Sequence, residues 1–388
     1  DIETPGRHTL SFSMREDGFT FDQFALSNDI AWRPGKIEEP SPIMDAVDLP
    51  TDFPEKDFSL STPSAEGFDD AKFDAAMEYL LSHCNEDGLS ETMVLHRGRV
   101  IFEGDSVDNV HNIWSCSKSF TSTALGLLID EGKCSLDTIA ADHEPELSEF
   151  YPDVRLSHFA SMTSGYSAEG RSRWNDENSD WSWTPYKPED PMFSPGSHFA
   201  YWDEAQMMFG RVLTRIAGEP LVEYLERQVF TPIRMGDVEW KMEGEVDGVA
   251  INNGCTNIHL SARQLARFGL LMMANGRWKS EQVIPEEWIS LATSTQVSGN
   301  TPVFDGDRAN VRGSGSYGFN WWLAGGESGM PLAPPTTFYA SGLHHNVLCV
   351  VPEWDLVIVR MGVDGNPNYG KHNVYNEFLA KLALAKMR

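Results

Sequence analysis

The residues Ser115-Cys116-Ser117-Lys118 form an S-x-x-K motif, and the apolar run at 124–129 that follows predicts a buried helix. Side chains at positions i and i+3 lie on one face of a helix, so the amine of Lys118 can reach the hydroxyl of Ser115. A lysine that is desolvated at the head of an apolar helix has a lowered pKa and can accept the serine proton. We therefore predict Ser115 as a nucleophile and Lys118 as its base.

The position of Ser115 at the start of this helix adds a second chemical element. A backbone N–H at a helix N-terminus points outward, and the helix dipole favours negative charge that develops there. One short segment would then supply the nucleophile, the base and half of an oxyanion hole. A chain of 388 residues also contains S-x-x-K patterns by chance, so this interpretation depends on the segments around the motif.

Segments on either side of the motif predict strands and helices. Two pairs of short apolar runs are typical of β-hairpins, and two periodic segments are typical of helices. The hairpins span residues 92–102 and 347–359, and the helices span 69–84 and 374–386.

Two further elements are expected between these segments. Ser261 is predicted to cap a helix that runs through Met273, and the aromatic residues 317–323 predict a strand.

The middle of the chain has a different character, with helical runs, many turn residues and few strand signals. We predict an α/β fold of the α+β kind, with an antiparallel sheet flanked by helices. Residues 65–140 and 251–388 would form this sheet domain, and residues 141–250 a mostly helical inserted domain. Residues 1–64 are rich in Pro, Asp and Glu and are predicted to form an extended N-terminal arm.

A second chemical motif is Tyr201-Trp202-Asp203, which stands where a loop meets a predicted helix. A tyrosine at such a junction can place its phenol beside the Ser/Lys pair and pass a proton to the leaving group. Trp202 adjoins this predicted acid, so we expect it to contact the substrate. The alternative interpretation of Tyr201 is a core tyrosine bonded to the backbone.

A third motif lies just before the second hairpin, at residues 339–346. Gly342 lacks a side chain and lets the backbone approach a bound substrate closely. The N–H of Leu343 is then a candidate second oxyanion donor, a contact worth roughly 3 kcal/mol of activation barrier. His344 is predicted to narrow the pocket, with a surface-loop histidine as the equal alternative.

These three motifs together resemble the penicillin-recognising serine hydrolases, the S-x-x-K family of β-lactamases, D-Ala peptidases and related esterases. The resemblance spans roughly residues 65–388 and includes the helix motif at 261–269 and the Y-G-x-x-W-W pattern at 317–322. It is greatest to the class C β-lactamase-like branch, and there to the 6-aminohexanoate-dimer hydrolases. The resemblance implies a β-lactamase/transpeptidase-like fold.

The resemblance also assigns roles to particular residues. It implies an acyl-enzyme on Ser115, with Lys118 as base and Tyr201 as the acid/base that protonates the leaving group. The N–H groups of Ser115 and Leu343 would form the oxyanion hole. Water would then hydrolyse the acyl-enzyme.

The chain departs from the family pattern at two positions. The tyrosine motif usually reads Y-x-N, but Asp203 stands in place of the asparagine. A carboxylate there would hold Lys118 as an ammonium, face away from it, or bind a cationic amine of the substrate. Ala340 stands where other branches carry the lysine that grips the carboxylate of β-lactams, which argues against penicillin hydrolysis.

We therefore expect a serine amidase/esterase that cleaves a linear amide, in the manner of a 6-aminohexanoate-dimer hydrolase, or a carboxylic ester. The alternatives are a carboxylesterase of the class C β-lactamase-like type and a D-amino-acid peptidase or β-lactamase. A non-enzymatic alternative is a degenerate acylation sensor in which Asp203 disables Lys118.

Composition excludes other classes of function. With 58 acidic and 30 basic residues, the formal net charge is −28, which disfavours nucleic acid and anionic membranes as partners. The five scattered cysteines, and histidines without metal-ligand spacing, predict no disulfide framework, no metal and no cofactor. We expect a soluble protein that acts on a small molecule. Homodimer formation is left open, as is the choice between cytoplasm and periplasm.

Overall fold

The computed structural model describes residues 52–84, 86–169, 184–304, 312–325, 330–363 and 371–387. The described residues all belong to one compact unit, Pro50–Arg388. Most of the arm expected over residues 1–64 lies outside the described residues. The division of the remaining chain into a sheet domain and an inserted domain stays a prediction.

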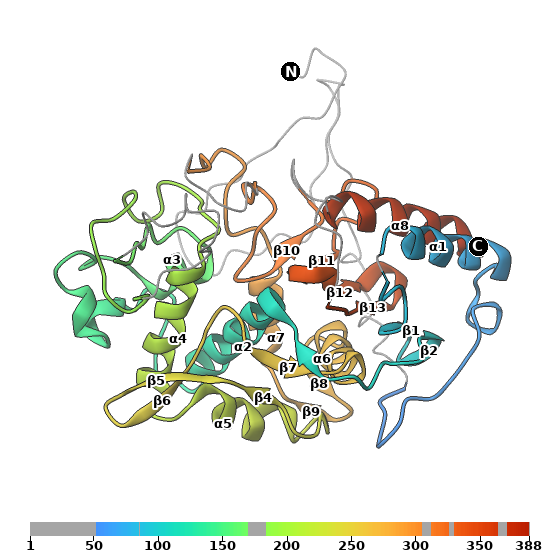
Figure 1. Cartoon of the computed structure of the whole chain (residues 1–388), viewed down its shortest axis with the longest axis horizontal. Coiled ribbons are helices and arrows are strands. Elements are labelled where there is room, and N and C mark those ends of the chain that lie inside the picture. The colour runs from blue at the N-terminus through green and yellow to red at the C-terminus, as the bar shows by residue number, and fades with distance from the viewer. Residues whose placement is uncertain are drawn as a thin grey trace, which may run out of the picture. The chain divides into compact units, whose positions relative to one another are not determined.

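A six-stranded antiparallel sheet forms the framework of this unit (Figure 1). Its strand order is β10-β11-β12-β13-β1-β2. The strands are β1 Thr92–His96, β2 Arg99–Glu103, β10 Trp322–Leu323, β11 Phe338–Gly342, β12 Asn346–Val351 and β13 Leu356–Arg360. Both predicted hairpins are present, and they meet where β1 pairs with β13. The sheet therefore joins strands from the beginning and from the end of the described chain.

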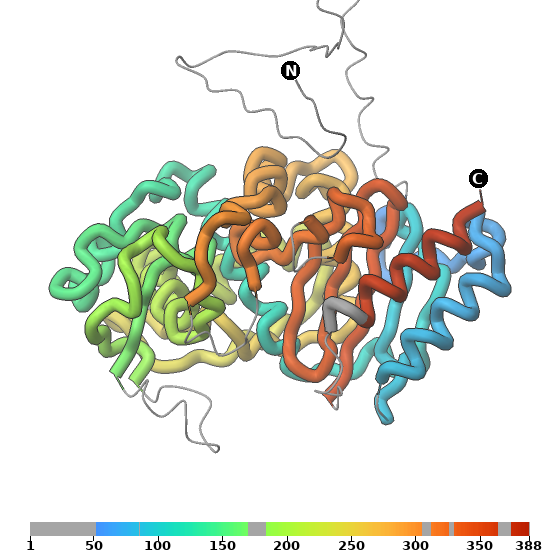
Figure 2. The backbone as a smooth tube through the Cα atoms, turned by 90° about the horizontal axis from the view of Figure 1, so that it is seen from above, coloured from blue at the N-terminus to red at the C-terminus, as the bar shows by residue number. Residues whose placement is uncertain are grey.

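Helices cover both faces of this sheet. The central strands β1, β12 and β13 are therefore buried along their whole lengths. On one face α1 (Asp70–Ser82) and α8 (Lys371–Ala385) pack side by side, as Figure 2 shows. On the other face α6 (Ala262–Met273) packs against the same three strands. These helices and strands confirm the predicted mixed fold with an antiparallel sheet flanked by helices.

The N-terminus of α6 forms as the sequence predicts. The Ser261 side chain accepts the Gln264 N–H, and the Gln264 side chain accepts the Ser261 N–H, so the two residues make a reciprocal capping box.

The helix α2 (Ser117–Asp130) connects the sheet to the middle of the chain. It contacts α4 (Asp203–Ala217) and α5 (Leu221–Leu225) as well as β11. Residues Ser117 to Leu128 of α2 are all buried. The predicted S-x-x-K helix thus packs against both the sheet and the helices of the middle segment.

The remaining elements are short. The helices are α3 Leu156–Ala160 and α7 Glu286–Ala292. The strands are β3 His111–Asn112, β4 Glu239–Trp240, β5 Met242–Val246, β6 Val249–Asn252, β7 Ile258–Leu260, β8 Arg277–Trp278 and β9 Glu281–Gln282. The strands β4 and β5 and the start of β6 lie inside the segment expected to be mostly helical. The sequence does not indicate β5, because this strand is largely exposed and lacks the apolar alternation of a half-buried strand.

The strand expected over 317–323 is wrong for most of its length. Only Trp322 and Leu323 are in a strand, β10. The chain turns before them, since the Gly318 N–H donates to the Trp321 carbonyl at 2.9 Å and Asn320 has a φ of 57°. A residue with positive φ interrupts an extended strand, and no periodicity of the aromatic residues reveals it.

Candidate active site

Ser115 lies in a 3₁₀ turn, Trp114–Cys116, that leads directly into α2. The turn is held at its start because the side-chain oxygen of Asn112 accepts the Trp114 N–H at 2.8 Å. From the first turn of α2, Lys118 Nζ donates a hydrogen bond to Ser115 Oγ at 2.8 Å. The expected contact between the serine and the lysine of the motif is therefore present.

Hydroxyl groups on α2 hold the loops around the site. Ser122 donates to the Phe319 carbonyl at 2.7 Å and Ser119 to the Asn320 carbonyl at 3.0 Å. On another side, Thr121 donates to the Gly254 carbonyl at 2.8 Å. Buried hydroxyls need such partners. The sequence analysis identified this helix by its apolar half and missed these side chains, although the run of Ser and Thr from 117 to 123 was a signal.

Lys118 is almost fully buried, with 2% of its side chain exposed, and it forms an ion pair with Asp203. The distance from Lys118 Nζ to Asp203 Oδ1 is 2.7 Å. A third bond joins Nζ to the carbonyl oxygen of Cys255 at 3.2 Å. Of the three interpretations open for Asp203, contact with the lysine is the one found here.

The carbonyl of Cys255 reaches Lys118 because two glycines meet beside it. An added Cβ at Gly254 would lie 2.2 Å from the Gln206 carbonyl oxygen, and one at Gly210 would lie 2.7 Å from the Gly254 nitrogen. Side chains at either position would force α4 away from this segment. The sequence analysis did not single out either glycine.

The pKa of Lys118 is raised above its usual value. Burial is the largest influence and would lower this pKa, but Asp203, Tyr201 and Cys255 together raise it by more. The expected lowering of the Lys118 pKa is therefore wrong, because the lysine is paired as well as desolvated. At neutral pH this amine is an ammonium ion.

Tyr201 lies immediately before α4 and faces the same amine. Lys118 Nζ sits over the Tyr201 ring, 4.9 Å from its centroid, and the ring stacks on Trp322 with centroids 5.5 Å apart. Burial raises the pKa of Tyr201, although Lys118 and a hydrogen bond with Ser115 act in the opposite direction. Tyr201 is thus a partly buried, protonated phenol beside the serine, which is the state that a proton donor needs.

Gly342, at the end of β11, lies against the serine turn. An added Cβ at Gly342 would lie 2.2 Å from the Ile113 carbonyl oxygen and 3.2 Å from the Ser115 nitrogen. Leu343 follows, with half of its side chain exposed. The two segments that carry the predicted oxyanion donors are therefore in contact, and the role of each N–H group stays a prediction.

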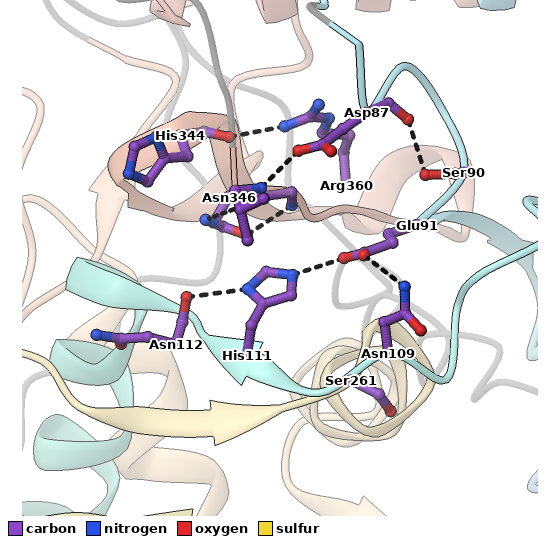
Figure 3. A network of polar contacts seen from close by, with 12 residues as sticks. Asp87, Ser90, Glu91, Asn109, His111, Asn112, Ser261, His344, Asn346 and Arg360 are labelled. Atoms are coloured by element: carbon purple, nitrogen blue, oxygen red, sulfur yellow. Dashed lines mark hydrogen bonds and ion pairs between the residues drawn. The ribbon is translucent and has the colours of Figure 1, made fainter.

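The turn after Leu343 is held by buried side chains (Figure 3). Arg360, on β13, donates to the His344 carbonyl at 2.7 Å, and Asn346 donates to the Leu343 carbonyl at 2.6 Å. His344 and His345 both have positive φ values, 58° and 59°, which non-glycine residues rarely adopt. The two bonds fix a backbone conformation that the residues would otherwise avoid.

The other two predicted substrate contacts differ in accessibility. The His344 ring is partly exposed and lies edge-on to Trp114, with centroids 5.5 Å apart. Trp202 is only 3% exposed and packs in the main hydrophobic core. Substrate contact by either residue stays a prediction.

A cavity of about 660 Å³ lies along α4, and the sequence analysis did not predict it. Met207 and Arg211 line it and follow Asp203 by one and two helical turns, on the same face of the helix. Its other charged and aromatic lining residues are Glu146, Tyr186, Lys187 and Glu243. The cavity therefore lies further along the face of α4 that begins at Asp203, and Asp203 itself is not among its lining residues.

Neither a metal centre nor a membrane helix is found in the described part of the chain. Within it, no three His, Cys, Asp or Glu side chains gather as metal ligands would. The helices described there also lack the length and apolar character that crossing a membrane requires.

Comparisons with known proteins agree with this architecture. The family model named Beta-lactamase matches residues 73–380. A 6-aminohexanoate-dimer hydrolase of Paenarthrobacter ureafaciens is 24% identical over 310 residues, which cover 73% of this chain and 76% of that protein.

Solved structures share the fold. One is a Bacillus anthracis protein named as a candidate 6-aminohexanoate-dimer hydrolase, with a TM-score of 0.63, 19% identity, and coverage of 88% of this chain and 91% of that one. Another is EstCE1, described as a hydrolase with promiscuous acyltransferase activity. Its TM-score is 0.60 at 15% identity, with coverage of 82% of this chain and 100% of that one.

Proposed function

Because the chain belongs to the β-lactamase family of serine hydrolases, we propose that it cleaves a linear amide through an acyl-enzyme on Ser115. The observation that carries this proposal is the 2.8 Å hydrogen bond between Lys118 Nζ and Ser115 Oγ at the head of α2. A serine hydroxyl becomes a nucleophile when a neighbouring group can take its proton. The site around Ser115 supports that chemistry, with an ion pair and a phenol beside the hydroxyl.

The proposed reaction has two halves. Ser115 Oγ attacks the carbonyl carbon, and the N–H groups of Ser115 and Leu343 bind the oxyanion. Tyr201 gives its phenol proton to the leaving amine as the C–N bond breaks. Water then hydrolyses the acyl-enzyme and restores the serine.

The cavity along α4 supports an amide with charged ends as the substrate. Glu146 and Glu243 could bind an amine, while Lys187 and Arg211 could bind a carboxylate. A short linear amide built from amino acids carries both of these groups. The curated relative's name describes such a compound, a dimer of 6-aminohexanoate. Ala340 lacks the cation expected for β-lactam recognition, so a penicillin is a poorer candidate.

A carboxylic ester is the second candidate substrate. EstCE1 shares the fold and is described as a hydrolase with acyltransferase activity. Attack by Ser115 on an ester uses the same nucleophile and oxyanion donors. An alkoxide also leaves more easily than an amine, so an ester makes a smaller demand on Tyr201.

Pre-steady-state kinetics with a p-nitrophenyl ester tests this proposal. We expect a burst of p-nitrophenol that is stoichiometric with the enzyme, followed by slower turnover. The Ser115→Ala variant should lose both phases, and Ser294→Ala, an exposed serine that bonds the Leu291 carbonyl, should keep them. No acylation of the wild type by any ester or amide in a panel would overturn the proposal and favour a degenerate sensor.

The same panel distinguishes the substrate classes. It should contain 6-aminohexanoate-type amides, short-chain esters, D-amino-acid peptides and a β-lactam. We expect the highest kcat/KM for a linear amide with a free amine and a free carboxylate. A preference for esters without charged ends would favour the second candidate instead.

A further inference from the structure

The partner of Lys118 raises a question about the proton that leaves Ser115. A base must have a free lone pair, but Lys118 Nζ donates to Ser115 Oγ and Cys255 O and lies 2.7 Å from Asp203 Oδ1 in an ion pair. Two donated bonds and an ion pair place an acceptor on three sides of the amine, which suits the three protons of an ammonium group. In this arrangement Lys118 is a cation that bridges the serine and a carboxylate.

The charge balance of the buried Lys118–Asp203 pair also favours an ammonium form of Lys118. An isolated ammonium ion is costly to bury, whereas one paired at 2.7 Å with a carboxylate is compensated. Asp203 keeps 17% of its side chain exposed, while Lys118 keeps only 2%. The carboxylate is therefore the member of the pair that lies closer to solvent.

Several titratable groups face this pair from the surrounding elements. They are Tyr201 before α4, Cys255 before β7 and Tyr317 before β10, while Glu204 on α4 and Glu243 on β5 act on Cys255. Burial raises the pKa values of Tyr201, Cys255 and Tyr317, so these three groups are protonated at neutral pH. Asp203 is the carboxylate that contacts Lys118, through the ion pair at 2.7 Å.

We propose that Asp203 is the proton acceptor for acylation and that Lys118 is the bridge through which the proton moves. This inference rests on the proposed function, because it assigns a step to the same Ser115 reaction. An Nζ proton passes to Asp203 Oδ1, which becomes a neutral acid and leaves a free lone pair on Nζ. That lone pair takes the hydroxyl proton as the bond from Ser115 Oγ to the acyl carbon forms, so Lys118 is again an ammonium ion.

The proton returns when the leaving group departs. Tyr201 protonates the leaving nitrogen as the C–N bond breaks, takes a proton from Lys118, and Lys118 takes one back from Asp203. Both charges of the ion pair are then restored, and the serine proton has moved to the amine product. No oxidant, metal or further co-reactant is needed.

The Asp203→Asn variant tests the proposal, because asparagine has nearly the same shape and restores the usual Y-x-N pattern. Loss of the acceptor should slow Ser115 acylation at neutral pH by about 10²–10⁴-fold, the range of general-base catalysis. Asp137→Asn removes the same charge from an exposed ion pair with Arg155 and should leave the rate unchanged. Faster acylation by Asp203→Asn at neutral pH would overturn the proposal, since Asp203 would then only suppress Lys118.

The pH profile separates a proton acceptor from a merely structural residue. In the wild type the acylation rate should stay flat from neutral to alkaline pH, because a carboxylate acceptor gains nothing from a higher pH. In Asp203→Asn the acceptor must be neutral Lys118, so the rate should rise about tenfold per pH unit toward alkaline pH. Identical profiles for the two enzymes would refute the inference.

Two further measurements complete the test. Asp203→Glu keeps the carboxylate and should recover part of the rate that Asp203→Asn loses, together with the flat profile above neutral pH. An Asp203→Glu rate no higher than that of Asp203→Asn would contradict the inference. The wild-type burst with p-nitrophenyl ester distinguishes the two levels of failure. If the wild type shows no burst, the proposed function is wrong. If the wild type shows a burst and Asp203→Asn shows the same burst at the same rate, only the proposed role of Asp203 is wrong.

Discussion

At the scale of single residues, Tyr201 is the proposed proton donor to the leaving group, and amide and ester substrates need this proton to different extents. Its phenol is partly buried and protonated beside Ser115 and Lys118. An amine is a poor leaving group unless it is protonated, whereas p-nitrophenolate leaves unaided. Removing the phenol proton should therefore affect the two substrate classes unequally.

Tyr201→Phe is expected to lower kcat for a linear amide by about 10²–10⁴-fold while lowering acylation by a p-nitrophenyl ester much less. Both rates are measured on the same preparation, one by amine release and one by the burst. Tyr339→Phe, which changes a buried tyrosine on β11, serves as the matched control. Equal losses for the two substrates in Tyr201→Phe would contradict the leaving-group role.

A second residue-scale prediction concerns His111, on β3 (Figure 3). Its Nε2 lies 2.5 Å from Glu91 Oε2, and both side chains are mostly buried. Burial opposes protonation, but the hydrogen bond and charge of Glu91 outweigh it and raise the pKa of His111. The protonated pair therefore stabilises the fold below the unfolded-state pKa, and that stability is lost as pH rises through the folded-state pKa.

Glu91→Gln should accordingly lower the free energy of unfolding more at about pH 5.5 than at about pH 8.5. Urea titrations of the wild type and the variant at both pH values give the two differences. Glu353→Gln, at an exposed position beside Thr336, is a suitable control and should change little at either pH. A larger loss of unfolding free energy at about pH 8.5 than at about pH 5.5 would show that the protonated His111 does not stabilise the fold through Glu91.

The three residues of the predicted reaction were accessible to sequence reasoning because their spacing is local. Ser115 and Lys118 meet through one helical turn, and Tyr201 stands at a recognisable loop-to-helix junction. The ion pair between Lys118 and Asp203 was not predictable in the same way. An aspartate in the first turn of α4 can face several directions, and only the packing of α4 on α2 selects one.

At the scale of elements, the contact between β11 and the serine turn depends on a missing side chain. A methyl group at Gly342 would lie 2.2 Å from the Ile113 carbonyl oxygen, so the two segments would have to separate. That movement would pull the Leu343 N–H away from the position that the proposed oxyanion hole requires.

Gly342→Ala should therefore reduce acylation of Ser115 by about 10²–10³-fold, the effect of losing one oxyanion donor. The burst rate measures this, and thermal unfolding shows whether the variant is folded. Gly299→Ala adds the same methyl group where the structure has open space and ordinary φ, so its rate should be unchanged. A normal burst rate in folded Gly342→Ala would rule out this donor geometry.

The elements themselves were predictable where a local pattern decides them. Ser261 caps α6 as expected, and both hairpins form. Residues 317–321 turn instead of extending, because buried hydroxyls of Ser119 and Ser122 bind the carbonyls of Phe319 and Asn320. Those contacts join segments about 200 residues apart, and no local pattern contains them.

At the scale of the whole molecule, strand order brings distant parts of the chain to one site. The pairing of β1 with β13 follows from neither hairpin alone, and β11, two strands from β13 in the same sheet, contacts α2. The formal charge of −28 also acts at this scale, since like charges repel one another in a compact state.

Salt should therefore stabilise the protein. Raising NaCl from roughly 0.01 M to roughly 1 M shortens the Debye length from about 30 Å to about 3 Å and screens this repulsion. We expect the urea midpoint at pH 7 to increase with salt. Near the sequence pI of about 4.6 the same salt step should have a much smaller effect. A midpoint at pH 7 that falls with salt would contradict the prediction.

Peptide mapping of a trapped acyl-enzyme tests the central claim most directly. The protein is mixed with a p-nitrophenyl ester, quenched in acid during the burst, digested and analysed by mass spectrometry. The account predicts one acyl group on the peptide that contains Ser115, and none on that peptide in Ser115→Ala. Turnover without an adduct on Ser115, or turnover that survives in Ser115→Ala, would contradict it.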